Sequence, residues 1–494
     1  MLRKLSEKHI LWGMIILYVV IFGTLTTLRH YNFETQAWDM GIFEQSFWNA
    51  ANGRGLINTI EQTPKHLGVH FSPFLFLLVP GFMFFDSPYY LLLVQTLALA
   101  LGAWPLFLLA KKILGQQKTA SHWALAITAA YLLYPSLHAI QMFDFHEAAF
   151  FVPLLLSALY FLEIEKWLPS GIFLSLAAAT KEDMILAVMF VGIFLLFKTI
   201  RQKIEDLKDR KKKIIAGIII LSALIYFLLV AKVFMPAFGG GVLRIDRYSH
   251  LGETAIAMIQ NAIVHPLLLV KTVFTLPKMF YAFWLFLPLL FLPFLSWRPF
   301  ILLIPGLAEN LLTNYWPQYN SLYHYDAILI PGILVATIYG VKTVVERWPN
   351  KERPLRFLFM ATILAGVLLH SPVRPTAFPV SYFQTTPQET AYRNLVKLVP
   401  NDVSVATHTN LVPHLANREK VYFAGLETKR TDIVLLDAGN LFGFGSDEAF
   451  TNYVESYRAS GEYNLYSFDE RYFVLLNKKL RLSGLPAKPQ QENP

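Results

Sequence analysis

The chain has no cysteine among its 494 residues. This absence excludes disulfide bonds, thiolate metal sites and cysteine nucleophiles together. Charge is also scarce, because Asp, Glu, Lys and Arg make up only 16% of the sequence, against about a quarter in soluble domains. No internal repeat is visible, which removes one common signature of transporters built from symmetric halves.

Apolar residues take the place of the missing charge. The sequence is 55% hydrophobic and 15% aromatic, with a mean hydropathy of +0.43. These values indicate an integral membrane protein. The first apolar run, 10–28, is too long for the core of a signal peptide and is expected to remain as a span. The net charge of +9 lies largely in short loops, where basic residues set orientation, so it requires no nucleic acid partner.

Basic clusters alternate with the apolar runs and predict about 11 transmembrane helices, with the N-terminus in the cytoplasm. An outer loop, 29–87, contains a Pro-interrupted apolar segment, 71–86, which we interpret as interfacial helix and not as a span. The charged triplet 181–183 is too costly to bury in mid-membrane and splits one apolar stretch into two short helices. The predicted spans are 10–28, 88–110, 121–137, 148–163, 168–180, 184–198, 214–235, 277–295, 299–315, 325–342 and 356–370.

The pattern changes after residue 381. Short apolar runs and polar helical stretches alternate there, which predicts a small extracytoplasmic α/β domain over 381–482, following a transmembrane domain over 1–375. The tail, 483–494, is rich in proline and is expected to be disordered. The predicted strands are 403–406, 421–423, 433–436 and a hairpin of 463–468 with 472–476, and the predicted helices are 391–398 and 448–458.

Two carboxylates open the outer loop. Asp39 either caps a helix running from Met40 to Asn52 or acts as a general base at the membrane surface. Glu44 lies just over one turn further on and is either a solvated residue or a second catalytic carboxylate. Both residues are candidate catalytic groups.

Two histidines follow in the same loop. His66 and His70 are four residues apart, a spacing that suits a metal on a helix, but Gly68 and Pro73 argue against a regular helix. Contacts to phosphate or sugar are therefore the favoured interpretation for both. A divalent metal stays an alternative, and no metal ligand is assigned.

Other ionisable residues are predicted to gather on the same outer side. Asp144 with Glu147, and Thr180 with Asp183, fit capping boxes. This leaves His146, Lys181 and Glu182 without a structural explanation, and Lys181 suits a phosphate.

A glycine run precedes Arg244 and Arg247, which suit an anionic ligand or lipid headgroups. Glu309 lies far along an apolar run, where a carboxylate is a functional hypothesis by default. His324 and Tyr325 follow just before the next span and complete the candidate set of substrate- or phosphate-binding residues.

Several segments together resemble a bacterial family of multi-spanning membrane proteins, a domain of unknown function placed in the GT-C glycosyltransferase superfamily. The resemblance covers most of residues 10–375. The matching segments are Trp38-Asp39-Met40-Gly41-Ile42-Phe43-Glu44-Gln45, His66-Leu67-Gly68-Val69-His70-Phe71-Ser72-Pro73, Phe143-Asp144-Phe145-His146-Glu147, Lys181-Glu182-Asp183 and Tyr323-His324-Tyr325.

The resemblance implies a GT-C-like fold in the bacterial cytoplasmic membrane and transfer of a sugar from a polyprenyl-phosphate carrier to an unknown acceptor. The acidic residue in the first outer loop of such enzymes serves as base or metal ligand, and Asp39 matches that place. The sequence lacks an Asp-x-Asp pair in this loop, which disfavours a metal. Two other classes stay open: a transporter or flippase of a lipid-linked or anionic substrate, and a non-catalytic membrane assembly protein.

Overall fold

A computed structural model of the chain describes residues 6–61, 63–115, 119–199, 207–241, 244–427, 429–469, 471–482 and 485. The contacts divide the chain into two compact units. The first consists of Met1–Thr24, His70–Leu75 and Leu93–Pro379, and the second of Leu25–Val69, Phe76–Leu92 and Val380–Pro494. The tail predicted to be disordered lies outside the described residues, apart from Leu485.

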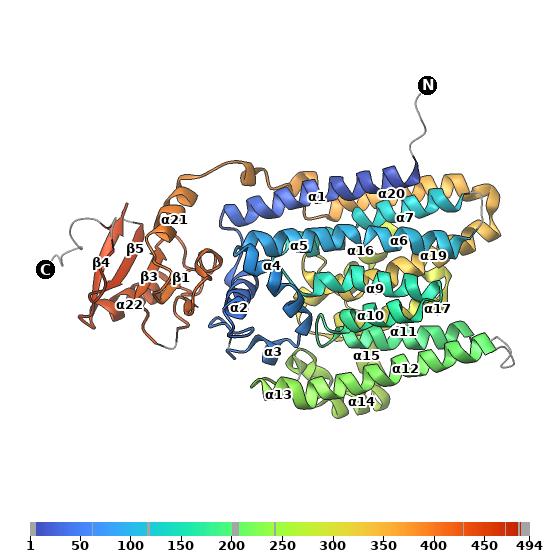
Figure 1. Cartoon of the computed structure of the whole chain (residues 1–494), viewed down its shortest axis with the longest axis horizontal. Helices are drawn as coiled ribbons and strands as arrows, with labels where there is room; N and C mark the ends of the chain where they lie inside the picture. The colour runs from blue at the N-terminus through green and yellow to red at the C-terminus, as the bar shows by residue number, and fades with distance from the viewer. Residues whose placement is uncertain are drawn as a thin grey trace, which may run out of the picture. The chain divides into compact units, whose positions relative to one another are not determined.

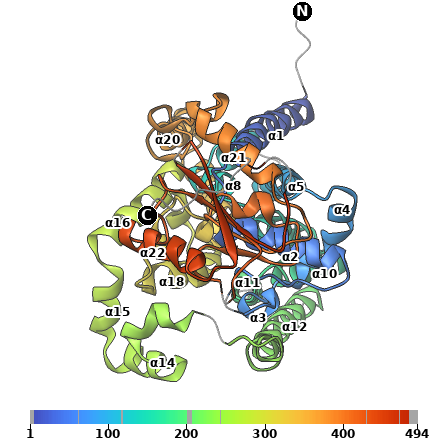
Figure 2. The ribbon, with the colours of Figure 1, turned by 90° about the vertical axis from the view of Figure 1, so that its left-hand side faces the viewer.

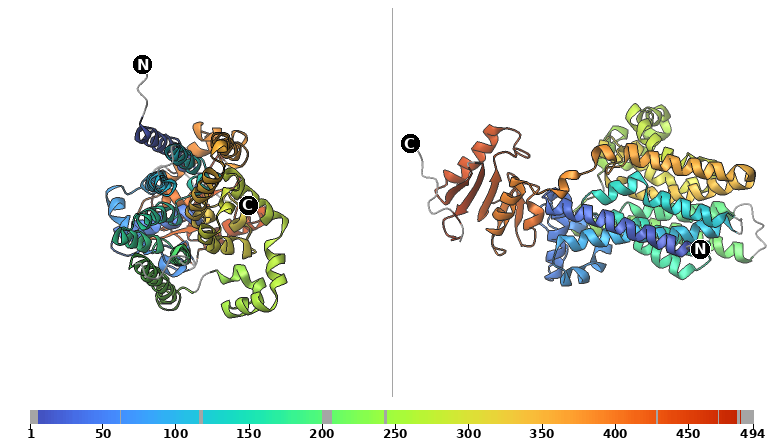
Figure 3. Two further views of the ribbon diagram at one scale, coloured as in Figure 1. Left: turned by 90° about the vertical axis from the view of Figure 1, so that its right-hand side faces the viewer. Right: turned by 90° about the horizontal axis from the view of Figure 1, so that it is seen from above.

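The first unit is helical, and its long helices run roughly parallel (Figure 1; end-on in Figure 3, left). Two shorter helices, α14 and α15, follow one another at its rim (Figure 2). The helices that contribute to this unit are α1 (Glu7–Tyr31), α5 (Pro88–Leu101), α6 (Ala103–Leu114), α7 (Ala120–Leu132), α8 (Pro135–Met142), α9 (Ala148–Glu163), α10 (Trp167–Ala178), α11 (Met184–Thr199), α12 (Leu207–Leu229), α14 (Ala255–Val264), α15 (Pro266–Val273), α16 (Leu276–Phe286), α18 (Ile304–Leu312), α19 (Ile330–Arg347) and α20 (Glu352–His370).

Most helices fall where the apolar runs predicted them, but α14 and α15 lie between 236 and 276, where the sequence predicts no span. Within the described residues, five helical stretches are long and apolar enough to cross a membrane, or six if the bent pair of 245–264 and 266–273 forms one span. Four shorter apolar helices accompany them. The charged triplet 181–183 separates α10 from α11, as the cost of burying charge predicted. The count of 11 spans and the orientation stay predictions.

Close backbone packing fixes α19. A Cβ atom at Gly340 would lie 2.1 Å from the carbonyl oxygen of Leu292, and one at Gly332 would lie 2.9 Å from that of Leu302. Only glycine allows the helix to approach these two carbonyls so closely. The same helix begins directly after the turn His324–Ile328, so its position determines where that turn lies.

The second unit contains a five-stranded sheet with the strand order β2-β1-β3-β5-β4 (Figure 3, right). β1 is parallel to β2 and β3, whereas β5 is antiparallel to β3 and β4. The predicted strands and both helices, including the hairpin, are confirmed with bounds that differ by at most four residues. Their bounds are β1 (Val405–Thr407), β2 (Val421–Phe423), β3 (Ile433–Asp437), β4 (Tyr463–Phe468), β5 (Tyr472–Asn477), α21 (Pro387–Lys397) and α22 (Asp447–Arg458).

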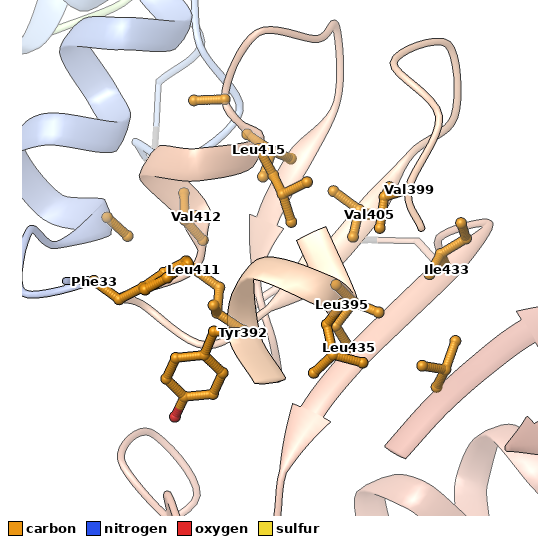
Figure 4. Packing of buried hydrophobic residues seen from close by; sticks show 14 of the residues in the cluster. Phe33, Tyr392, Leu395, Val399, Val405, Leu411, Val412, Leu415, Ile433 and Leu435 are labelled. Atoms are coloured by element: carbon orange, nitrogen blue, oxygen red, sulfur yellow. The ribbon is translucent and has the colours of Figure 1, made fainter. Parts of the chain in front are cut away.

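The first loop shares a hydrophobic core with this sheet. Phe33, Ile42 and Ile60 are buried in one cluster with residues of α21, β1 and β3, and Figure 4 shows Phe33 lying beside Leu411 and Val412. The loop itself forms short elements and no long helix. These are a π turn (Ala37–Gly41), α2 (Ile42–Ala51), α3 (His66–Val69) and α4 (Val79–Phe84).

Thr59 pairs with the outer edge of β2. Its hydroxyl donates to the carbonyl of Val421 at 2.6 Å and accepts from the Val421 N–H at 3.1 Å. The Gln45 amide donates to the carbonyls of Arg418 and Glu419 just before the strand. β2 is an edge strand, and these contacts satisfy the backbone groups that such an edge would otherwise leave unpaired.

Candidate functional site

The loop between α10 and α11 carries a buried ion pair in the first unit. The Nζ of Lys181 lies 2.9 Å from Oδ2 of Asp183, and the two side chains are only 8% and 15% exposed. Burying an ammonium group is costly unless it is paired. Asp183 is therefore the residue that allows Lys181 to stay charged at this position.

Glu182, which lies between α10 and α11 like Lys181, binds two residues of the first outer loop, His70 and Phe71. The Nδ1 of His70 lies 2.9 Å from one carboxylate oxygen of Glu182, and the backbone N–H of Phe71 donates to the other at 2.9 Å. Burial alone would raise the pKa of Glu182, but His70 and Lys181 outweigh burial and hold the pKa low. Glu182 is thus an ionised acceptor that fixes His70.

Arg247 lies against two tyrosines. Its guanidinium carbon is 4.0 Å from the ring centre of Tyr315 and 5.6 Å from that of Tyr325. Its Nη1 donates to Oε1 of Gln318 at 3.1 Å. Aromatic faces attract a guanidinium and hold it flat, so these contacts preorganise a cation with several N–H groups.

Glu309 joins this group through Gln318 and Tyr248. The Nε2 of Gln318 donates to a carboxylate oxygen of Glu309 at 3.4 Å, and the Tyr248 hydroxyl donates to its backbone carbonyl at 3.0 Å. Glu309 lies on α18, which packs through Gly306 against Ile328 and Leu329. The carboxylate is therefore held at a fixed distance from Arg247.

His146 and His324 stack on each other, with ring centres 3.6 Å apart and an interplanar angle of 21°. The Nδ1 of His146 lies 3.1 Å from a carboxylate oxygen of Glu147. His324 is in the electrostatic field of Lys181, His70 and Arg247. The stacked pair therefore belongs to the same cluster as the ion pair and the arginine.

These residues form one buried ionic cluster, defined here as His70, His146, Glu147, Lys181, Glu182, Asp183, Arg247, Glu309, His324 and Tyr325. Glu309 is in electrostatic contact with Asp183, Lys181, Glu182 and Arg247, and Lys181 also with Glu147. Carboxylates outnumber the lysine and the arginine. The cluster can therefore accept hydrogen bonds from several hydroxyl groups as well as hold an anion.

The second unit holds the two candidate catalytic carboxylates. Asp39 is half-buried in the π turn, and the N–H of Ala37, at the start of this turn, donates to Oγ1 of Thr409 at 3.1 Å. The capping interpretation of Asp39 is wrong, because α2 begins at Ile42 with Gly41 as its N-cap. Single π turns are frequent at functional sites.

Glu44 is buried on α2, with 2% of its surface exposed. Burial, with a smaller contribution from Asp86, raises the pKa of Glu44 well above its usual range. Its Oε2 has no hydrogen-bond partner within the part of the chain that the structure describes. This excludes the solvated interpretation and leaves a buried, readily protonated carboxyl group, as acid–base catalysis requires.

Several other sequence expectations need correction. His66 and His70 do not lie on one helix and do not contact the same residue. His66 lies in the second unit, with its Nδ1 3.0 Å from a carboxylate oxygen of Glu61, whereas His70 lies in the first unit and pairs with Glu182. Neither expected capping box forms. Glu147, not Asp144, is the N-cap residue of α9 and makes no side-chain cap, and the Thr180 hydroxyl donates backwards to the carbonyl of Ala177.

Arg244 is exposed, in contrast to Arg247. Among the described residues, no group of three or more His, Cys, Asp or Glu side chains is arranged to hold a metal ion.

Sequence reasoning missed the partners that organise the cluster. The sequence pattern places Asp183 in a helix cap and indicates no role for Tyr248 or for Gln318. One signal in the sequence could have indicated them. Polar residues are frequent on both sides of Glu309, more so than capping the end of an apolar helix requires. Spacing along the chain does not reveal which of them meet.

The fold and the buried ionic cluster define a multi-helix membrane protein with an added five-stranded sheet domain. The chain belongs to the family described as predicted membrane protein DUF2079, whose model matches residues 29–467. No curated protein matches it.

Among solved structures, the chain is similar to the apo oligosaccharyltransferase of Archaeoglobus fulgidus, with 11% identity and a TM-score of 0.47, over 94% of this chain and 74% of that one. It is also similar to apo ArnT of Cupriavidus metallidurans, with 12% identity and a TM-score of 0.47, over 94% and 97% of the two chains.

Proposed function

We propose that the chain is a membrane glycosyltransferase that moves a sugar from a polyprenyl-phosphate donor to an acceptor at the outer face of the cytoplasmic membrane. The N-terminus is then cytoplasmic, and the sheet domain lies outside. The observation that carries the proposal is the buried ionic cluster. Charged groups among apolar helices are expensive and mark substrate sites, and the family resemblance implies which substrate.

Arg247 is the residue proposed to hold the donor phosphate. Its guanidinium offers five N–H donors in a planar fork that matches phosphate oxygens, and the bond to Gln318 occupies only part of this capacity. Negative charge grows on the phosphate as the glycosidic bond breaks. A fixed cation therefore stabilises the transition state more than the ground state.

We place Lys181 second to Arg247 as a ligand of the donor phosphate. Because Asp183 already neutralises it, it is a weaker phosphate ligand than Arg247. We assign the carboxylates of Glu182 and Glu309 to the sugar, since carboxylates accept hydrogen bonds from hydroxyl groups. His70, His146, His324 and Tyr325 line the same cluster and complete the proposed donor site.

Asp39 is the proposed base. It takes the proton from an acceptor hydroxyl, whose oxygen attacks the anomeric carbon. The bond from this carbon to the phosphate oxygen breaks, and its electron pair leaves with the polyprenyl phosphate. Glu44, five residues further along the same loop, would store or return a proton, as its raised pKa allows.

The test is a transfer assay on the full chain in nanodiscs. Polyprenyl-phosphate sugars are supplied, and release of polyprenyl phosphate is measured for the wild type, Asp39→Asn and Arg247→Met. Glu34→Gln, an exposed carboxylate in the same loop, and Arg353→Met, an exposed arginine, are the matched controls. We expect each test variant to lose about a hundredfold or more in kcat and each control to keep its activity.

Full activity of Asp39→Asn would remove the base assignment. No release from any donor, together with lipid binding that neither variant changes, would favour the transporter or assembly alternatives. If Arg247→Met raises KM and leaves kcat unchanged, Arg247 binds the substrate and the transition state equally well and does not stabilise the transition state selectively.

A further inference from the structure

A polar cavity lies in the first unit, among residues that the ionic cluster does not include. Its volume is about 200 Å³, which is room for about seven water molecules. Charged and aromatic residues line it, namely Glu163, Glu165, Trp167, Lys198, Lys212 and Tyr339. It is therefore a site of its own, formed where α9, α11, α12 and α19 meet.

The charges in this cavity are balanced. The Nζ of Lys198 lies 2.5 Å from a carboxylate oxygen of Glu163, and that of Lys212 lies 3.0 Å from one of Glu165. Each ammonium group has three N–H donors, so these contacts leave donors for a ligand. The cavity thus presents two ammonium groups and two carboxylates to one ligand.

A shallow apolar groove adjoins the cavity at one shared residue. Trp167 lines both, and the groove follows one face of α10 through Leu168, Gly171, Ile172 and Ser175. Leu168 is 76% exposed and Ile172 is 51% exposed. No atom lies within 4 Å of the place where a Cβ at Gly171 would be, so this glycine leaves the groove open.

We propose that the cavity and the groove bind a zwitterionic glycerophospholipid with a primary ammonium group, namely phosphatidylethanolamine. The phosphate lies against Lys198 and Lys212, the ammonium group donates to Glu163 and Glu165, and an acyl chain follows the groove along α10. An anionic headgroup would leave the two carboxylates facing negative charge. A choline headgroup has no N–H to donate to them.

The site does not depend on the proposed enzyme activity. Only its leaflet follows from the proposed orientation, because the basic run after Lys198 marks the cytoplasmic side. The lipid would contact side chains of four helices, α9, α11, α12 and α19.

Native mass spectrometry of the delipidated full chain tests the proposal, with phosphatidylethanolamine, phosphatidylglycerol and phosphatidylcholine of the same acyl chains as probes. We expect the wild type to retain phosphatidylethanolamine about tenfold better than either other lipid, the difference expected from one charge-assisted hydrogen bond. Gly171→Leu, which fills the groove, and the double variant Glu163→Gln with Lys198→Met should each abolish the preference.

Gly13→Leu is the control, because it adds the same bulk at another exposed glycine with no neighbour within 4 Å. Equal retention of the three lipids by the wild type would overturn the proposal, since the ion pairs would then serve only to join helices. If Gly171→Leu keeps the lipid preference of the wild type, the proposal that an acyl chain lies in the groove is wrong. This variant alters only an exposed face, so it keeps the test valid if the charge variant fails to fold.

Discussion

Replacing Thr59 by Val should release the first loop from the sheet domain. Val has the shape of Thr but no hydroxyl, so both bonds to Val421 are lost, the one donated at 2.6 Å and the one accepted at 3.1 Å. Val421 is fully buried, and its N–H and C=O would then lack these partners. At about 1 kcal/mol for each hydrogen bond, the loss is about 2 kcal/mol.

Hydrogen exchange measures this loss where it occurs. A destabilisation of about 2 kcal/mol corresponds to about thirtyfold faster exchange, and we expect it at the Val421 amide and over residues 37–59. Thr59→Ser keeps the hydroxyl and should exchange like the wild type. Thr451→Val makes the same replacement at an exposed position of α22 and should change neither segment.

Exchange at Val421 that stays within about threefold of the wild type in Thr59→Val would refute the reasoning, because a loss below about 0.7 kcal/mol means that these bonds do not hold the loop. Faster exchange over the whole sheet, including β4 and β5, would also contradict it. The change would then be general unfolding of the second unit.

Two further predictions concern Glu44 and Gly340. Because burial raises the pKa of Glu44, folding loses stability as pH rises above the carboxyl's unfolded pKa, by at most about 1.4 kcal/mol for each pH unit. Glu44→Gln should therefore have a higher melting temperature than the wild type at pH 8, and the increase should be smaller at pH 5. An equal increase at both pH values would show that the charge of Glu44 is not the cause. Gly340→Ala would place a methyl group 2.1 Å from the Leu292 carbonyl oxygen and should destabilise the helical unit by about 1–3 kcal/mol. Gly217→Ala, whose Cβ would meet nothing within 4 Å, should melt like the wild type.

Sequence patterns predicted the elements of this fold better than its contacts. Apolar runs located the helices, alternation located the strands, and the cost of charge in a membrane located the break between α10 and α11. Local sequence signals did not predict the hydrogen-bond partner of a side chain that had two available partners. Thr180 fits a capping box, but its hydroxyl bonds backwards to Ala177, and nothing in the spacing favours one bond over the other.

The sequence named most members of the buried ionic cluster but did not reveal how they pair. The sequence predicts that Lys181 binds phosphate and that Asp183 belongs to a capping box, whereas the two side chains form one ion pair in the structure. The contact of Thr59 with Val421 joins positions 362 residues apart. A pairing of this kind depends on how distant elements pack, and no local rule of propensity or spacing contains it.

The shared core of the first loop and the sheet also sets an order of assembly during synthesis. Thr409 leaves the ribosome 372 residues after Ala37, to which it bonds. At roughly 5–20 residues per second, this delay is roughly 20 to 75 seconds. Throughout that time Phe33, Ile42 and Ile60 lack the sheet residues that bury them. The loop that carries Asp39 reaches its final form only when the chain is nearly complete, so an interrupted chain would hold its helices without a finished first loop.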